Sequence, residues 1–300
     1  MPSKFSPYLY LIAHMKKPDV TGLVTSYCVP EEVENLEQTY QDWEKSTNEL
    51  RSIEQKEIGI VDSNNLTPIS HEKIEEVKKN PLFKNSFSNT AIDFQYIELD
   101  NLIAPQRNVS ENYVEQLIQR IPDQPTEDEL IDLCISPKQN VPQPKATQNQ
   151  NGWIFSSPSV DFRFLGGFLK DKITEDDLQF TNVGAQPIYA ITLFVGYGAG
   201  SINVFQVGNR LILNNGFHRV YSLYKKGIKK IPVVVQKIGN PALEFTAPLQ
   251  GLSSDYLLKH PRPVVVKDFF NEKLTRVFKR KIIIRTVIIG LGVETNDFEV

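Results

Sequence analysis

Hydrophobic residues recur at the spacing of one helix face over residues 31–57. The apolar positions are Val33, Leu36, Tyr40, Trp43, Leu50 and Ile53. This spacing predicts an amphipathic helix, and the same window holds nine acidic and three basic residues, a net charge of −6. Such a face is either an acidic docking surface or the solvated side of an ordinary helix, and the solvated side is the preferred interpretation.

A strand followed by a helix is predicted between residues 94 and 121. Apolar residues from Phe94 to Leu102 indicate the strand, which Pro105 ends. Asn108 and Glu111 have the spacing of a capping box, so we expect the helix to open there. The residues expected on its buried face are Tyr113, Val114, Leu117, Ile118 and Ile121.

Residues 187–213, PIYAITLFVGYGAGSINVFQVGNRLIL, predict two or three strands joined by turns. The glycine-rich GYGAG segment, residues 196–200, resembles a phosphate-binding loop in composition. It joins two strands instead of a strand and a helix, so a hairpin turn is the preferred interpretation. In contrast, residues 137–152 are rich in Pro, Gln and Asn without periodicity, and predict a linker or exposed loop. The whole pattern is that of an α+β protein.

The segment LILNNGFHRVYSLYKKGIKKIPVVVQKI, residues 211–238, predicts a strand, a helix over 216–226 and a second strand over 231–238. Phe217, Val220, Tyr221 and Tyr224 fall on one helix face. The backbone N–H groups of a helix start lack intrahelical acceptors and favour an anion. The turn therefore has two interpretations: a phosphate-binding helix start, or an ordinary tight turn beside a structural histidine.

Composition narrows the class of protein. The 300-residue chain has a net charge of −3 and 40% hydrophobic residues, which is typical of a soluble globular protein. Cys28 and Cys134 lie in unrelated contexts, which excludes a thiolate zinc site and favours a reducing compartment. No metal site is predicted from the histidines. The start has only a short apolar run, so a cytoplasmic protein without a membrane segment is expected.

The segment 211–238 resembles the second conserved box of the ParB/sulfiredoxin superfamily, in which a strand leads to Gly-x-His-Arg or Gly-x-Arg-Arg at the start of a helix. The segment YIELDNLIAPQRNVSENYVEQL is similar to the family's first box. The resemblance implies a mixed sheet with helices, and three regions: a partly helical N-terminal extension over 1–92, a core over 93–240 with an insertion at about 122–185, and a basic C-terminal extension over 241–300.

The resemblance also implies a nucleotide site. Asn215, Gly216, His218 and Arg219 correspond to the family's phosphate-binding group, with ATP or CTP as ligand and usually magnesium. Gln106 and Arg107 correspond to the polar residues of the first box, which line the same pocket in the CTP-using branch. A carboxylate from Glu98 or Asp100 corresponds to the catalytic base of the free-serine kinase branch.

Two departures from the family pattern bear on the activity. Phe217 stands where sulfiredoxins carry their nucleophilic cysteine, so sulfinic-acid reduction of the known kind is not expected. Asn215 replaces an aspartate found in many members. The leading hypothesis is nucleotide binding with phosphotransfer or nucleotide triphosphate hydrolysis. The alternative is a non-enzymatic, nucleotide-gated adaptor that binds DNA or a protein. A scaffold with an inactive pocket is a third.

The adaptor hypothesis depends on the basic segment 259–285, which has nine basic and two acidic residues, a net charge of +7. A helix over 268–281 is expected there, with Phe270, Leu274, Val277 and Phe278 inward. The outward residues would be Lys273, Arg276, Lys279 and Arg280. This face is either a surface for DNA or an acidic protein, or an ordinary solvated face.

Overall fold

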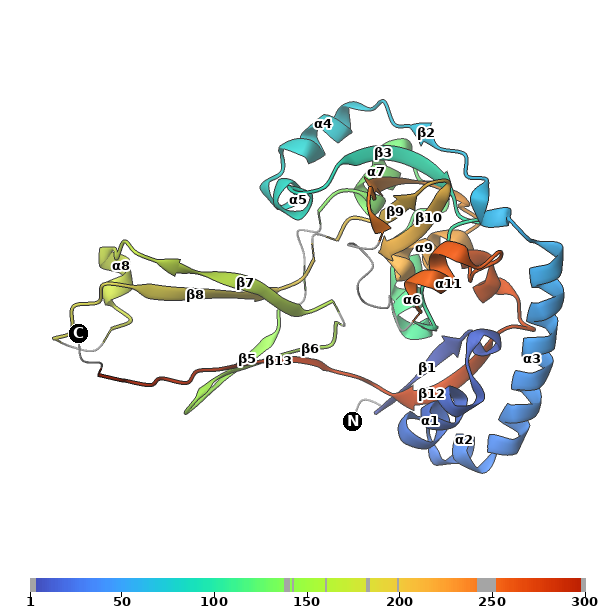
Figure 1. Cartoon of the computed structure of the whole chain (residues 1–300), viewed down its shortest axis with the longest axis horizontal. Helices are drawn as coiled ribbons and strands as arrows, with labels where there is room; N and C mark the ends of the chain where they lie inside the picture. The colour runs from blue at the N-terminus through green and yellow to red at the C-terminus, as the bar shows by residue number, and fades with distance from the viewer. Residues whose placement is uncertain are drawn as a thin grey trace. The chain divides into compact units, whose positions relative to one another are not determined.

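The computed structural model describes residues 4–137, 141, 143–159, 161–181, 184–198, 200–241 and 252–297. These residues form two compact units (Figure 1). Unit 1 comprises residues 1–138 and 199–282, and unit 2 comprises residues 139–198 and 283–300. The unit boundaries therefore differ from the regions expected from the sequence, since residues 1–92 and most of 241–300 share unit 1 with the expected core.

A mixed sheet forms the centre of unit 1, with the strand order β10-β9-β11-β3-β2. Its strands are β2 (Thr67–Pro68), β3 (Ile92–Glu98), β9 (Asn203–Val207), β10 (Arg210–Asn215) and β11 (Lys230–Lys237). β11 runs parallel to β9 and antiparallel to β3. Residues 231–236 of β11 are all buried, because helices cover both faces of this central strand. The α+β class predicted from the sequence is confirmed.

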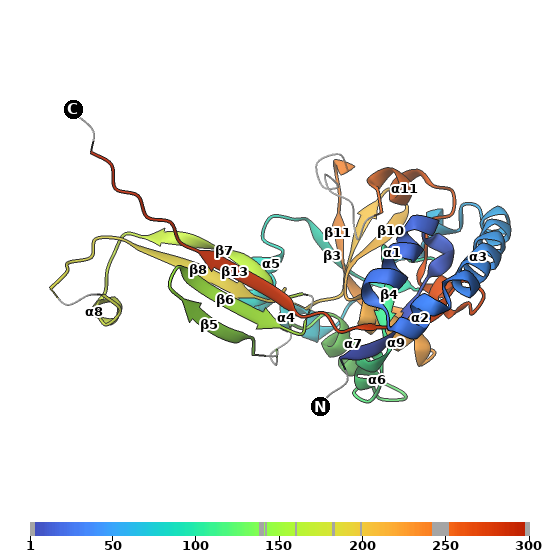
Figure 2. The ribbon, with the colours of Figure 1, turned by 90° about the horizontal axis from the view of Figure 1, so that it is seen from below.

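Helices pack the two faces of this sheet (Figure 2). They are α4 (Glu72–Lys79), α5 (Pro81–Ser86), α7 (Glu127–Cys134), α9 (Phe217–Lys225) and α11 (Ser254–Lys259), while α6 (Glu111–Ile118) packs against α9. The helix predicted over 216–226 and its flanking strands are confirmed as β10, α9 and β11. Phe217, Val220 and Tyr221 of α9 are buried, so the face read from the sequence is the packed one.

A second layer of unit 1 joins the N-terminal residues to residues 276–281. Its small sheet has the order β12-β1-β4, with β1 (Phe5–Tyr10), β4 (Asn108–Ser110) and β12 (Arg276–Lys281). The 3-10 helix η1 (Ile12–His14) and α1 (Lys17–Tyr27) follow β1, and α2 (Pro30–Glu34) and α3 (Leu36–Lys56) come next. The helix predicted over 31–57 is confirmed, with a break at Asn35. Two further 3-10 helices are η2 (Ile60–Asp62) and η3 (Val266–Phe270).

The predicted capping box at Asn108 is wrong. Residues 108–110 are extended and pair with Tyr8, Leu9 and Tyr10 of β1. The helix α6 begins at Glu111 after Ser110, whose side chain makes no capping hydrogen bond. Pairing with a strand about a hundred residues away therefore overrides the local capping signal.

The predicted helix over 268–281 is also wrong. Residues 266–270 form η3, and residues 276–281 form β12, which pairs antiparallel with β1. Burial along β12 alternates, with Phe278 and Arg280 buried and Val277, Lys279 and Lys281 exposed. This period of two is that of a strand with one face packed, and it turns Arg280 inward.

Unit 2 consists of two antiparallel sheets and a short helix, α8 (Glu175–Leu178). One sheet has the order β13-β6-β5, with β5 (Lys145–Asn149), β6 (Gly152–Ser157) and β13 (Arg285–Gly290). The other joins β7 (Arg163–Lys170) to β8 (Ala190–Gly196). The expected linker over 137–152 therefore includes a strand. The expected hairpin turn at 196–200 is wrong, because β8 and β9 belong to different sheets.

Among the described residues, no helix combines the length and the apolar character needed to cross a membrane.

Candidate functional site

The start of α9 lies where β10 ends. Gly216 connects them with a φ of 99°, in the left-handed region that glycine adopts without strain. The first intrahelical bonds run from the N–H groups of Arg219 and Val220 to the Gly216 carbonyl, 3.0 Å each. The N–H groups of Phe217 and His218 precede these bonds at the positive end of the helix dipole. This is the local geometry that an anion-binding helix start requires.

Gly216 is also needed for packing within the protein. A Cβ atom at this position would stand 2.7 Å from Ile202 Cγ1 and 3.2 Å from Arg219 Nη2. The residue that approaches the glycine backbone is therefore Ile202, from the segment before β9. The close approach to the Gly216 backbone therefore has a cause within the protein.

Arg219 is buried, with 8% of its surface exposed. Its Nη1 donates to the Leu133 carbonyl at 2.9 Å, and its Nη2 donates to the Gly200 carbonyl. Leu133 lies in the last turn of α7, where backbone carbonyls lack intrahelical donors and a cation is favourable. The guanidinium thus holds the end of α7 and the segment before β9 against α9. Both hydrogen bonds would have to break before the guanidinium could bind a phosphate through two N–H groups.

His218 brings the two segments of the family resemblance together. Its Nε2 accepts a hydrogen bond from the backbone N–H of Ser110 at 3.3 Å, and its ring lies edge-on to Tyr113, with centroids 5.2 Å apart. Ser110 ends β4, four residues after Gln106. Because Nε2 accepts here, a neutral His218 ring carries its proton on Nδ1.

Asn215 belongs to a network of amide side chains that the sequence did not reveal. Its Nδ2 donates to the Ser201 carbonyl at 3.0 Å. That carbonyl also accepts from Asn203 Nδ2, and Asn203 Oδ1 accepts from Asn214 and Gln236, both at 2.8 Å. The network fixes the strand ends beside α9 through contacts between residues that are distant in sequence.

Gln106 and Arg107 lie in the segment that leads into β4. Arg107 Nη1 stands 3.4 Å from Asp19 Oδ2 of α1, with both side chains more than a third exposed. The Arg107 carbonyl accepts from the Leu11 N–H, and the Gln106 N–H donates to the Ala104 carbonyl. The structure therefore directs the Arg107 guanidinium toward α1.

Glu98 and Asp100, the expected catalytic carboxylates, lie near the other end of α9. Asp100 Oδ1 accepts from the Tyr224 hydroxyl at 2.5 Å, and Lys229 Nζ is 3.8 Å away. Burial, followed by the hydrogen bond to Asp100, raises the pKa of Tyr224. Glu98 pairs with Lys230 across β3 and β11. Since Tyr224 is seven residues after Phe217, about 10 Å of helix separates the two ends.

The basic residues of the C-terminal segment have partners within the chain. Lys273 lies 3.3 Å from Glu49, and Arg276 pairs with Glu32 and Asp42. Arg280 donates to the Tyr10 hydroxyl and packs against aromatic rings. The rings around its guanidinium belong to Tyr8, Tyr10 and Tyr27. Of the four charges, Lys279 is the one that is exposed and has no ion pair among the described residues.

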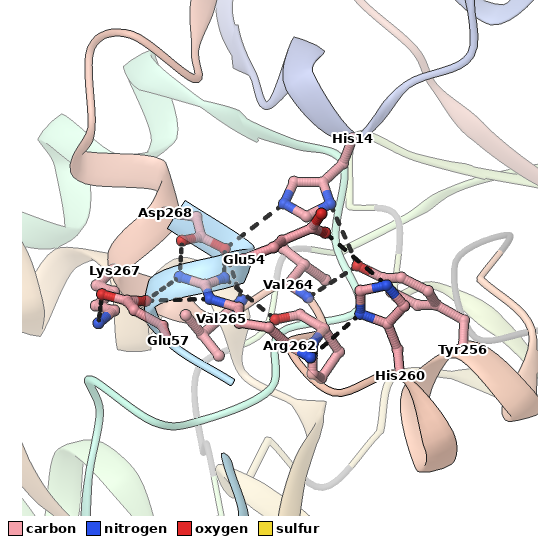
Figure 3. Close-up of polar contacts among 11 residues, drawn as sticks. His14, Glu54, Glu57, Tyr256, His260, Arg262, Val264, Val265, Lys267 and Asp268 are labelled. Carbon is pink, nitrogen blue, oxygen red and sulfur yellow. Dashed lines mark hydrogen bonds and ion pairs between the residues drawn. The ribbon is translucent and has the colours of Figure 1, made fainter. Parts of the chain in front are cut away.

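Sequence reasoning missed a buried ionic cluster in unit 1 (Figure 3). Arg262 is fully buried and forms a bidentate pair with Asp268, at 2.5 and 2.6 Å, while Glu57 accepts from its other edge at 2.8 Å. Lys267 also donates to Glu57. The available signal was an arginine between two prolines beside a run of three valines, an apolar setting that requires a buried charge to find a partner.

A histidine and a tyrosine extend this cluster. His14 Nε2 lies 3.6 Å from Asp268 Oδ2, and its Nδ1 lies 3.2 Å from the Tyr256 hydroxyl, which accepts from the Val264 N–H at 3.0 Å. Burial alone would raise the pKa of Asp268, but the adjacent His14 ring and Arg262 guanidinium lower it to about 2. The carboxylate is therefore ionised at neutral pH, and the cluster serves to anchor η1, α3 and η3 together.

No group of three or more His, Cys, Asp and Glu side chains in the described part of the chain is arranged to hold a metal ion. Comparisons with protein-family models, with curated proteins and with solved structures find no match to this chain.

Proposed function

We propose that unit 1 is a ParB/sulfiredoxin-like module that binds a nucleotide such as ATP or CTP by its phosphates at the start of α9. The observation that carries the proposal is the contact between Ser110 and His218, at 3.3 Å, since it places both segments of the family resemblance at one helix start. The left-handed Gly216 and the first-turn N–H groups of α9 supply the local geometry for an anion.

The proposal is limited to binding. The N–H groups of Phe217 and His218, with the His218 ring, would hold the phosphates, and a bound magnesium ion would neutralise part of their charge. Glu98 and Asp100 lie near the opposite end of α9, and Asp100 is engaged by Tyr224. Phosphotransfer by these carboxylates is therefore not part of the proposal, and a non-enzymatic nucleotide-gated module is favoured.

The test is calorimetric titration of the whole chain with ATP and CTP, with and without magnesium, in wild type and His218→Glu. An acidic side chain in the first turn stabilises an empty helix but repels phosphate. We expect nucleotide affinity to fall by about tenfold or more, the loss of a hydrogen bond to a charged group. Thermal denaturation of the variant is measured alongside, because the substitution also removes the contacts of His218 with Ser110 and Tyr113.

Lys225→Gln is the control, because it removes a positive charge from the last turn of the same helix. Its nucleotide affinity should match that of wild type. Absence of binding in wild type, or equal affinity in wild type and His218→Glu, would refute a site at the start of α9.

A further inference from the structure

The β7–β8 hairpin of unit 2 exposes an unusual amount of apolar surface. β7 and β8 pair with each other and, among the described residues, with no third strand. Eleven large hydrophobic side chains between residues 163 and 196 are exposed: Phe164, Leu165, Phe168, Leu169, Leu178, Phe180, Ile188, Tyr189, Ile191, Leu193 and Phe194. An isolated two-stranded hairpin is only marginally stable in water, and a large exposed apolar surface marks an interaction site.

The register separates the two faces of the hairpin. Directly opposed residues share a face, and Phe164 opposes Val195, Gly167 opposes Leu193, and Leu169 opposes Ile191. We call the face formed by these six residues the apolar face. Ile191 is 72% exposed, Leu169 61%, Phe164 50% and Leu193 37%. The opposite face carries Arg163, Lys170 and Thr192 beside Phe168 and Phe194, so only the apolar face lacks any polar side chain.

The apolar face is also suited to close packing against another sheet. A Cβ atom at Gly167 would stand 2.6 Å from Leu193 Cδ2, so the Leu193 side chain lies across the glycine. Because Gly167 has no side chain, Leu193 lies close to the backbone of β7 and this part of the face is flatter. Sheets that pack face to face interdigitate side chains of this kind, about 10 Å apart.

Charge around the hairpin limits what can cover this face. Residues 178–198 contain no charged side chain. The residues before them, 170–177, hold Asp171, Glu175, Asp176 and Asp177 against Lys170 and Lys172, a net charge of −2. An acidic tip disfavours an anionic membrane, and an uncharged face offers nothing to pair with a charged partner. The covering surface must itself be apolar and uncharged.

We propose that the apolar face of the β7–β8 hairpin packs against the same face of a second copy of this chain. A face without charges can meet its own copy without like-charge contacts, and homodimer interfaces are more apolar than those between different proteins. We take about 150–200 Å² for a fully exposed large apolar side chain and scale it by the exposed fraction of each residue. The four exposed residues of the apolar face, with Leu178, Phe180, Ile188 and Tyr189 near the hairpin tip, then supply roughly 800 Å² per copy. This matches the area each partner contributes to a standard stable interface.

The test is sedimentation velocity of the whole chain over a range of micromolar concentrations, comparing wild type, Ile191→Asp and Thr192→Asp. These neighbouring substitutions place the same charge on opposite faces of the same strand. We expect wild type and Thr192→Asp to form dimers of equal affinity. Ile191→Asp should weaken dimerisation on the order of 100-fold, because each copy would bury an unpaired carboxylate.

Crosslinking gives a second measurement that does not depend on a destabilising charge. Leu193→Cys lies at the centre of the apolar face, and should form a disulfide between two copies under mild oxidation, whereas Thr192→Cys should not. The native Cys28 and Cys134 are buried and do not compete.

Three outcomes would overturn the proposal: a wild-type monomer at all concentrations, equal effects of the two aspartate substitutions, or equal crosslinking of the two cysteine variants. A wild-type monomer that binds phosphatidylcholine vesicles and loses this binding in Ile191→Asp would assign the apolar face to lipid instead. Circular dichroism of each variant verifies that unit 2 remains folded.

Discussion

Arg219 is held by backbone carbonyls at Leu133 and Gly200, which are 86 and 19 residues away in sequence. Through these two hydrogen bonds, Arg219 connects α9 to the end of α7 and to the segment before β9. Its removal takes the guanidinium donors away from a buried carbonyl at Gly200 and a part-buried carbonyl at Leu133. An unsatisfied buried acceptor costs more than the net value of the bond it made.

Arg219→Met keeps the volume of the side chain and removes its donors. We expect the free energy of unfolding to fall by about 1.5–3 kcal/mol, measured by urea denaturation. Lys225→Met, an exposed position of the same helix, should change stability by less than about 0.5 kcal/mol. Equal midpoints for wild type and Arg219→Met would show that the carbonyl contacts contribute nothing to stability.

Asp268 makes the free energy of unfolding depend on pH in the acid range. Its pKa is about 2 in the folded protein and 3.8 in an unperturbed chain. A depressed pKa stabilises the folded state above the unfolded value, and this contribution disappears as pH falls through the folded value. The stability gap between wild type and Asp268→Asn should therefore narrow by about 2 kcal/mol between pH 5 and pH 2.

Chemical denaturation at a series of pH values measures this gap. Asp268→Asn should be the less stable protein at pH 5, because it leaves the buried Arg262 with a weaker partner. A gap that stays constant down to pH 2 would contradict a depressed pKa at Asp268.

At the scale of elements, the connection from β10 to α9 depends on one glycine for two separate reasons. Gly216 has a positive φ, and its missing side chain makes room for Ile202. Gly227, after the other end of α9, also has a positive φ, of 83°, but its side-chain position faces open space. An alanine at Gly227 would have only the cost of a left-handed backbone, whereas an alanine at Gly216 would have this cost and a steric clash with Ile202.

Gly227→Ala should destabilise the protein by about 1–2 kcal/mol, the cost of a left-handed alanine. Gly216→Ala should cost about 1–3 kcal/mol more, because Ile202 must also move. Thermal denaturation of both variants measures the difference. Similar losses for the two would mean that Ile202 yields without cost.

At the scale of the whole molecule, sequence reasoning predicted the elements whose signals are local. The apolar spacing of α3 and α9 and the buried run of β11 were sufficient to place them. It failed at β4 and β12, because both are extended by pairing with β1. It also could not find the acceptors of Arg219 or the partners of Arg262, since these contacts join residues that only the completed fold brings together.

The pairing of β1 with β12 also has a consequence for the order in which the chain folds during synthesis. Tyr10 and Arg280, which meet in this layer, are 270 residues apart. All the residues between them must therefore be synthesised before β1 can pair with β12, and contacts of such long range are slow to form. During synthesis, one edge of β1 stays open to other chains, as unpaired strand edges do. Closure of this sheet is therefore expected to be a late event in folding.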